Sequence, residues 1–246
     1  MPGTGGKGAV TRSTLRQQIA DALRDEVLAG RLQPGQEFTV KEIAEQYGVS
    51  ATPVREALVD LSAQGLLDAV QHRGFQVHAY SPDDYRGMVE ARSLVSDGIF
   101  QRLGDAGLPG GQEARAMAAL AGVRRRGEEA QRAADAGDLA ILIGYDLRFW
   151  RELSALFGNP YLVDFLHRLR VQCWVCAVQH LRRGPGGTGG AGGTDGGWAA
   201  EAKGRLWSGH TELVDALVRR DAVAAQAVVR AYNAHSLALI ERLAAG

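Results

Sequence analysis

Four ionisable residues in the later part of the sequence stand on helix faces that are otherwise apolar: Arg92, Asp146, His210 and His235. Each interrupts a run of apolar residues spaced three or four positions apart, which is the spacing of one helix face. Because a buried charge without a partner is costly, four such residues in one bundle should converge on one another, on a metal ion or on a ligand. The pattern predicts a polar pocket inside a helical bundle. For each residue alone, the alternative is a hydrogen-bonded core histidine or an internal ion pair between Arg92 and Asp146.

A second group of residues that could meet a ligand surrounds a tight turn near residue 48. Thr39 and Glu42 have the spacing of a capping box, which predicts that a helix begins there. Gly48 can adopt the left-handed conformation that ends a helix, so this helix is about two turns long.

Another helix is expected directly after this turn, although it carries a proline near its start. Pro53 falls in the first helical turn, where the missing N–H would have no intrahelical partner. Ser50 or Thr52 is suited to cap the helix. Thr52 and Arg55 then lie about one turn apart on a single face.

The elements around this turn have the order of a winged helix-turn-helix: three helices, then a β-hairpin formed by segments 66–70 and 75–78. In that arrangement the N-terminal end of the third helix enters the major groove of double-stranded DNA, and neighbouring basic residues contact the flanking backbone. The alternative for Arg55 is a surface ion pair with Glu56 or Asp60. The predicted DNA-binding residues are Lys41, Ser50, Thr52, Arg55, His72, Arg73 and Gly74.

The periodicity becomes almost entirely helical after residue 80, beginning with the N-cap pattern SPDD at 81–84. We therefore expect a disordered arm at 1–12, a DNA-binding domain at 13–80 and a helical domain at 81–246. The Gly-rich segment 184–197 is expected to be a flexible loop within the helical domain. The predicted fold class is mainly α, a winged helix-turn-helix followed by an all-α bundle of about six helices. The helices of the bundle are expected at 82–104, 110–136, 138–157, 159–182, 199–219 and 221–244.

Composition excludes some classes of protein. With 246 residues, 46% hydrophobic and 23% charged, the chain is globular and not disordered as a whole. It shows neither an apolar secretory signal nor a run long enough to span a bilayer, which predicts a cytoplasmic protein without a membrane partner. The formal net charge is zero, and acidic residues are about as numerous as basic ones within 1–80, so bulk electrostatics does not predict DNA binding. That prediction rests on motif geometry.

The N-terminal region resembles the DNA-binding domain of the GntR family of bacterial transcription regulators. The matching pieces are GRLQPG, the IAEQYGVS turn, TPVREAL and the RGFQV wing, within a run that covers residues 15–77. The resemblance implies a winged-helix fold and an operator as partner. One position departs, because the family usually has arginine where this chain has Ala51. Ala51 could touch a thymine methyl group, so the operator would differ from the usual family site.

The C-terminal region resembles the FCD effector-binding domain of the FadR-type branch of this family. The matching segments are EARSLVSD, YDLRFWREL, FGNP, GHTELVDALVRRDAVAAQ and YNAHSLALI. The resemblance implies a site with a metal held by one Asp and three His, beside an Arg that meets a carboxylate effector. Asp146, His210 and His235 match three metal positions and Arg92 matches the Arg, but Trp150 replaces the fourth ligand. Indole cannot bind a metal in its place, because its nitrogen only donates.

Two versions of this site follow from that substitution. Asp146, His210 and His235 could still hold one divalent ion such as Zn²⁺ or Ni²⁺ with open positions. Otherwise Arg92, His210 and His235 bind an anionic effector directly, with Trp150 as an apolar wall.

Taken together, the sequence predicts a homodimeric transcription regulator, not an enzyme, that binds a palindromic operator and is controlled by a small carboxylate. Repression is the commoner outcome in such families. The alternatives are a regulator that senses the metal itself and, less well supported, an enzyme of the non-haem-iron type using Asp146, His210 and His235. Cys173, Cys176 and His180 share one helix face and could form a thiol sensor, but inert buried cysteines are the favoured interpretation.

Overall fold

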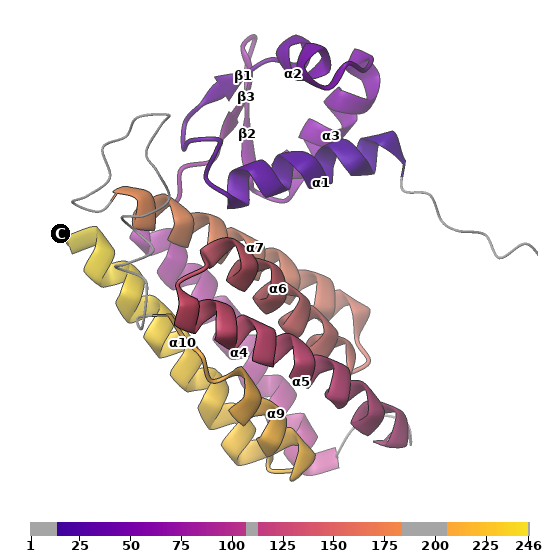
Figure 1. Cartoon of the computed structure of the whole chain (residues 1–246), viewed down its shortest axis with the longest axis vertical. Helices are drawn as coiled ribbons and strands as arrows, with labels where there is room; N and C mark the ends of the chain where they lie inside the picture. The colour runs from indigo at the N-terminus through magenta and orange to yellow at the C-terminus, as the bar shows by residue number, and fades with distance from the viewer. Residues whose placement is uncertain (1–13, 107–112, 184–205, 246) are drawn as a thin grey trace, which may run out of the picture. The chain divides into compact units, whose positions relative to one another are not determined.

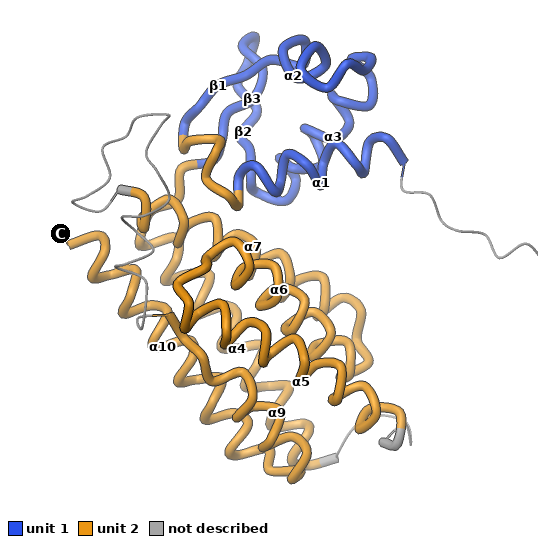
Figure 2. Tube along the Cα trace, viewed as in Figure 1, with its two compact units in different colours: residues 1–27, 35–78 blue, residues 28–34, 79–246 orange. Residues whose placement is uncertain are grey.

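The fold is mainly helical, as predicted, in the computed structural model, which describes residues 14–106, 113–183 and 206–245 (Figure 1). The chain divides into two compact units, one of residues 1–27 and 35–78 and the other of residues 28–34 and 79–246 (Figure 2). The predicted arm at 1–12 and the predicted loop at 184–197 lie outside the described residues.

The first unit packs three helices against a small antiparallel sheet. Its helices are α1 (Leu15–Leu28), α2 (Val40–Tyr47) and α3 (Ala51–Ala63). Its strands are β1 (Glu37–Phe38), β2 (Leu67–Val70) and β3 (Gly74–Val77), in the order β1-β3-β2. Apolar residues of all three helices fill the core, among them Leu23, Ile43 and Leu58. Burial of this kind fixes the angle at which α3 is presented.

The predicted turn between α2 and α3 is confirmed. The Thr39 hydroxyl accepts from the Glu42 backbone N–H at 3.2 Å, and Glu42 accepts from the Thr39 N–H at 2.7 Å, which completes the capping box. Gly48 is left-handed with φ 65°. Ser50 is the N-cap of α3, although its side chain makes no capping hydrogen bond, and Pro53 lies in the first turn. The other candidate cap, Thr52, is already inside the helix.

The sheet has one strand that the sequence pattern did not predict. Residues Glu37 and Phe38 pair with Gln76 and Phe75 of β3. Two residues are too few to show the alternation of apolar and polar residues that is typical of a strand, so β1 can be recognised only by its pairing with β3. The predicted hairpin is confirmed with its strands shifted by about a residue, and Val70 pairs with Gly74 at its closed end.

The second unit is a bundle of long helices that pack in neighbouring pairs. Helix α4 packs on α10, α6 on both α5 and α7, and the short α9 on α5 and α10 (Figure 1). Their bounds are α4 (Pro82–Ala106), α5 (Glu113–Ala136), α6 (Leu139–Ala155), α7 (Pro160–Arg183), α9 (His210–Val218) and α10 (Ala222–Ala245). None of the described helices combines the length and the apolar character needed to cross a bilayer.

One helix of this unit begins later than predicted. The expectation was a helix over 199–219, but residues 206–209 are not helical and α9 begins at His210. Gly209 occupies the N-cap position, where glycine is only about a few tenths of a kcal/mol less favourable than the residues whose side chains cap a helix. The other helix ends differ from expectation by a few residues. The late start of α9 places His210 in its first turn.

Candidate functional site

The residues predicted to read DNA bases lie exposed at the N-terminal end of α3. Ser50, Thr52 and Arg55 are all exposed. The predicted alternative for Arg55 is not formed, because Asp60 pairs with Arg16 at 3.4 Å and no acidic group within the described residues pairs with Arg55. The Arg55 guanidinium therefore projects into solvent with its donors available.

Lys41 and Arg73, which are predicted to contact the DNA backbone, are exposed as well. Each forms a weak ion pair with an acidic residue nearby. Lys41 lies 3.8 Å from Glu45, and Arg73 lies 3.5 Å from Glu37. Such surface pairs contribute at most about 1 kcal/mol, so a phosphate group can compete for these cations. The exposed His72 is left-handed with φ 61° at the hairpin tip beside Arg73 and Gly74.

Three of the four ionisable residues predicted to converge are almost completely buried in the second unit: Arg92, Asp146 and His210 are each 1% exposed. Asp146 on α6 is the centre of a hydrogen-bond cluster. His210 Nε2 lies 2.8 Å from Asp146 Oδ1, and the Trp150 indole donates to the same oxygen at 3.0 Å. The Trp174 indole on α7 donates to Oδ2 at 2.7 Å.

The surroundings of Asp146 favour its ionised form. Burial acts to raise the pKa of this carboxyl group, but the hydrogen bond and charge of His210, the charge of Arg170 and the Trp174 hydrogen bond outweigh burial. The resulting pKa is lower than the ordinary value. Asp146 is therefore a carboxylate at neutral pH.

Arg92 on α4 does not form the direct ion pair with Asp146 that was one alternative. Its Nη2 donates to Asn233 Oδ1 at 2.7 Å, and its guanidinium carbon lies 5.1 Å from the centre of the Tyr232 ring. Its Nε has no acceptor among the described residues. One donor of a fully buried arginine is thus left unsatisfied.

A second buried arginine, Arg170 on α7, belongs to this cluster and was missed by the sequence analysis. It is 3% exposed, and its guanidinium carbon lies 3.6 Å from the centre of the Trp150 ring and 5.3 Å from that of Tyr232. Neither Nε nor Nη1 has an acceptor among the described residues. Burial, followed by the nearby charge of Arg92, lowers the pKa of Arg170 to about 10, so it remains a cation at neutral pH.

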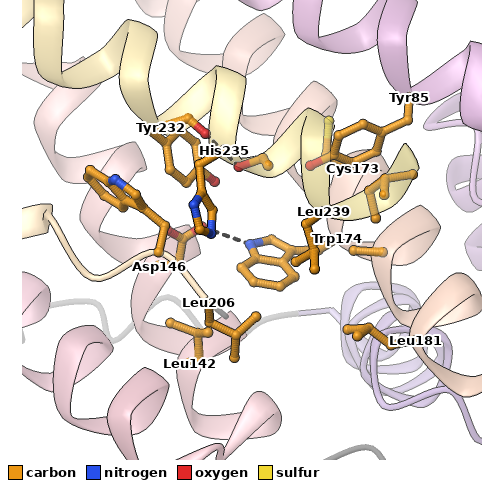
Figure 3. Close-up of a pocket in the computed structure, with 14 residues that line it drawn as sticks. Tyr85, Leu142, Asp146, Cys173, Trp174, Leu181, Leu206, Tyr232, His235 and Leu239 are labelled. Atoms are coloured by element: carbon orange, nitrogen blue, oxygen red, sulfur yellow. Dashed lines mark hydrogen bonds between the residues drawn. The ribbon is translucent and has the colours of Figure 1, made fainter. Parts of the chain in front are cut away.

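A pocket opens beside this cluster, and Asp146 and Tyr232 are among the residues that line it. Figure 3 shows Tyr232, His235 and Leu239 extending from α10 towards Asp146 and Trp174. His235, the fourth predicted residue, is half-buried and lines this pocket. Most of the remaining lining is apolar or aromatic, which suits an organic ligand.

The residues present do not fit the metal that the sequence resemblance implied. Within the described part of the chain, no group of three or more His, Cys, Asp or Glu residues is arranged to hold a metal ion. Asp146, His210 and His235 do not form one: His210 Nε2 is directed at Asp146 Oδ1, 2.8 Å away, and the Trp150 indole donates to the same oxygen. Indole has no lone pair to offer a metal in the σ plane, so Trp150 occupies the ligand position as a donor.

The cysteines of α7 have the character of core residues. Cys173 and Cys176 are buried and form no disulfide. Burial raises the pKa of Cys173, which keeps it a thiol and lowers its reactivity. Cys176 Sγ lies 3.6 Å from His180 Nδ1, but these residues do not form a metal-binding group in the described structure.

Comparison with known proteins assigns a family to each unit. Residues 15–77 match the family described as bacterial regulatory proteins, gntR family, and residues 112–235 match the FCD domain. The probable D-xylose utilization operon transcriptional repressor of Paenarthrobacter nicotinovorans is 40% identical over 94 residues, which is 38% of this chain and 41% of that protein. The HTH-type transcriptional regulator McbR of Escherichia coli is 38% identical over 77 residues, 31% of this chain and 34% of that protein. Each alignment spans less than half of the relative's own length.

Solved structures extend the similarity of fold over nearly the whole chain. The structure of E. coli McbR/YncC superposes with a TM-score of 0.72 and 20% identity, covering 94% of this chain and 99% of that one. A transcriptional regulator from Rhodococcus sp. RHA1 gives a TM-score of 0.64 and 19% identity, with 94% and 99% covered. At such identities the likeness concerns the fold alone.

Proposed function

Because the chain belongs to the GntR family of bacterial regulatory proteins and carries an FCD domain, we propose that it is a transcription regulator that binds operator DNA and responds to a small anionic effector. In this proposal residues 13–80 bind DNA, and residues 81–246 bind the effector and form a homodimer. The protein would act from the cytoplasm, without a membrane partner and without catalysing a reaction.

The observation that carries the DNA-binding half is the position of Arg55. It lies exposed in the second turn of α3, on the face that also carries Thr52, and no acidic side chain within the described residues pairs with it. An arginine at the groove-facing end of such a helix can donate two hydrogen bonds to the edge of a guanine. Lys41 and Arg73 would hold phosphates on either side, and a two-fold dimer would match a palindromic operator.

The observation that carries the effector half is the cluster around Asp146 and its neighbouring pocket. Buried arginines with unsatisfied donors are expected to meet an anion, and a carboxylate is the anion that the family resemblance implies. Binding would change DNA affinity only as far as the effector prefers one arrangement of the dimer over another. We propose repression as the sign of regulation, which is the role named for the relative from Paenarthrobacter nicotinovorans.

Selection of double-stranded DNA from a random pool tests the DNA-binding half. The purified chain should enrich an inverted repeat whose half-sites are about 10 base pairs apart, or a multiple of this spacing. Arg55→Ala should weaken binding to the selected site by about tenfold to a hundredfold, because a bidentate base contact is lost. Arg151→Ala, an exposed arginine of α6, is the matched control and should bind as the unchanged chain does.

Failure to enrich any sequence would overturn the proposed function.

Excess EDTA in the same binding assay distinguishes a regulator with an organic effector from a regulator that senses a metal ion. Operator binding should survive EDTA when the effector is organic and bound without metal, and it should be lost from a regulator that needs an ion to bind DNA.

A further inference from the structure

The buried residues of the second unit carry an imbalance of charge. Among the described buried residues, Arg92 and Arg170 are the two guanidinium groups, and Asp146 is the one carboxylate. The Cys173 thiol and the Tyr232 hydroxyl near them are neutral at pH 7, and burial raises the pKa of both still further, that of Tyr232 to about 12. At least one positive charge therefore lacks a buried counterion, which costs stability unless an anion arrives.

The same two arginines also lack hydrogen-bond acceptors. Arg92 Nε and Arg170 Nε and Nη1 have no partner among the described residues, although the side chains are 1% and 3% exposed. Guanidinium groups only donate, so the missing partners must be acceptors. A carboxylate supplies two acceptor oxygens and one negative charge, so it would provide both the missing hydrogen-bond acceptors and the missing counterion.

Asp146 does not supply the missing acceptors for these arginine atoms. Its oxygens already accept from Trp150, Trp174 and His210. Trp150 has a second role, since the guanidinium of Arg170 stacks on its ring at 3.6 Å. Trp150 thus contacts both the buried carboxylate and a permanent cation.

We propose that this cluster is a metal-free receptor for a single carboxylate, in which Arg92 and Arg170 bind the anion and Trp150 holds Arg170 in place. This inference rests on the proposed function, because it specifies the effector site of the same regulator. It adds Arg170 as a ligand-binding residue and makes Trp150 a positioning residue.

The pocket next to the cluster indicates the rest of the ligand. Tyr232 contacts both guanidinium groups and also lines the pocket, together with Trp174, Trp207 and Leu239. The arginines do not line the pocket themselves, whereas Tyr232 contacts both of them and lines the pocket, so in this proposal the Tyr232 side chain must shift to admit the carboxylate. The pocket side favours an aromatic or branched apolar body. Because a second negative charge would exceed the imbalance, a monocarboxylate is favoured over a dicarboxylate.

Thermal shift and calorimetric titration of the purified full-length chain in EDTA test the inference. Phenylacetate is the probe, its neutral isostere phenylacetamide is the ligand control, and malonate is the dianion control. Phenylacetate should stabilise the chain and phenylacetamide should not, because only the acid carries the charge. Zn²⁺ or Ni²⁺ added without EDTA should leave both the melting temperature and phenylacetate binding unchanged.

Variants locate the binding. Arg170→Gln and Arg92→Gln should each weaken phenylacetate binding by about tenfold or more, because a charge-assisted hydrogen bond is lost. Arg170→Lys keeps the charge without the planar fork and should fall between Arg170→Gln and the unchanged chain. Arg148→Gln is the matched control, since this exposed arginine of α6 also stacks on an aromatic ring, that of Tyr145 at 5.8 Å. Trp150→His should gain a Ni²⁺-dependent rise in melting temperature.

Several outcomes would overturn the inference: stoichiometric metal in the purified chain, loss of acid binding in EDTA, or no stabilisation by phenylacetate. Unchanged affinity in Arg170→Gln would equally exclude this arginine. The unchanged chain alone gives the contrast between acid and amide, so the test does not depend on a variant that folds. All these measurements omit DNA, so a failure here leaves the selection of operator DNA to decide the proposed function separately.

Discussion

The exposed cations on α2, on α3 and on the hairpin differ from those around Asp146 in one respect, which is access to water. Lys41, Arg55 and Arg73 are exposed and have weak acidic neighbours or none within the described residues. Arg92 and Arg170 are at most 3% exposed and retain donors without acceptors. Water satisfies an exposed guanidinium at no cost to folding, whereas a buried one depends on the groups packed around it.

This difference separates what each region can recognise. The exposed cations can meet a polyanion that approaches from outside, with energies set by salt and by groove geometry. The buried cations can discriminate a ligand by its charge and shape, because no water is there to replace a missing acceptor. Substitutions among the buried charged residues should therefore change the free energy of unfolding more than substitutions among the exposed ones.

The largest difference should come from removing one acidic residue in each region. Asp146→Ala removes the buried partner of His210 and the one buried carboxylate near the two guanidinium groups, and should lower the free energy of unfolding by about 3–5 kcal/mol. Glu37→Ala removes the exposed partner of Arg73 and should change it by less than about 1 kcal/mol. Urea denaturation of both variants measures the contrast. Equal losses would show that burial does not govern these pairs.

Protonating Asp146 should have a smaller effect than deleting it, because the neutral carboxyl group keeps its shape and some of its hydrogen bonds. Its folded-state pKa lies below the ordinary value of 3.8, so its contribution to stability is fully present above that value. The contribution is lost as the pH falls through the lower folded pKa. Urea unfolding between about pH 2.5 and 6 should show this acid limb, and Asp146→Asn should flatten it. An unchanged limb in that variant would assign the acid sensitivity to other carboxyl groups.

The sequence predicted this difference in part, because apolar stripes report burial directly. Arg92, Asp146 and His210 were recognised as misplaced on such stripes, and all three are buried. Arg170 obeys the same rule, since Leu166, Cys173 and Ala177 share its face at helical spacing and are buried too. The stripe on α7 therefore carries the information needed to predict that Arg170 is buried.

Other features depend on contacts between distant segments and left no local pattern. The hydrogen bond from Trp174 to Asp146 joins α7 to α6 across 28 positions, so spacing within one helix cannot indicate it. The two-residue strand β1 exists only because β3 offers a backbone to pair with. The capping box at Thr39 was predictable because all its partners lie within four residues.

Gly74 in the first unit tests the effect of shape alone, because glycine carries no charge. Its φ is 119°, and an added Cβ would lie 2.5 Å from the carbonyl oxygen of Phe38. Gly74→Ala should therefore lower the free energy of unfolding by about 1–3 kcal/mol. Gly48→Ala is the matched control, since Gly48 also has a positive φ but nothing within 4 Å of the added atom. The difference between the two variants in thermal or urea denaturation measures the steric contact. A smaller loss for Gly74→Ala than for Gly48→Ala would contradict this role.

The smallest structural effect should accompany Arg73→Ala, and this variant tests the exposed side of the comparison most directly. Its side chain is 70% exposed, so the free energy of unfolding should change by no more than about 0.5 kcal/mol. Because we expect Arg73 to hold a phosphate, operator affinity should fall for all sequences alike, and the slope of log affinity against log salt should decrease by about 1. Titrations of selected and random DNA at several salt concentrations measure both quantities. A loss confined to one base position would instead make Arg73 a base-reading residue, and an unchanged slope would remove it from the interface, because a released counterion is the physical signature of a phosphate contact.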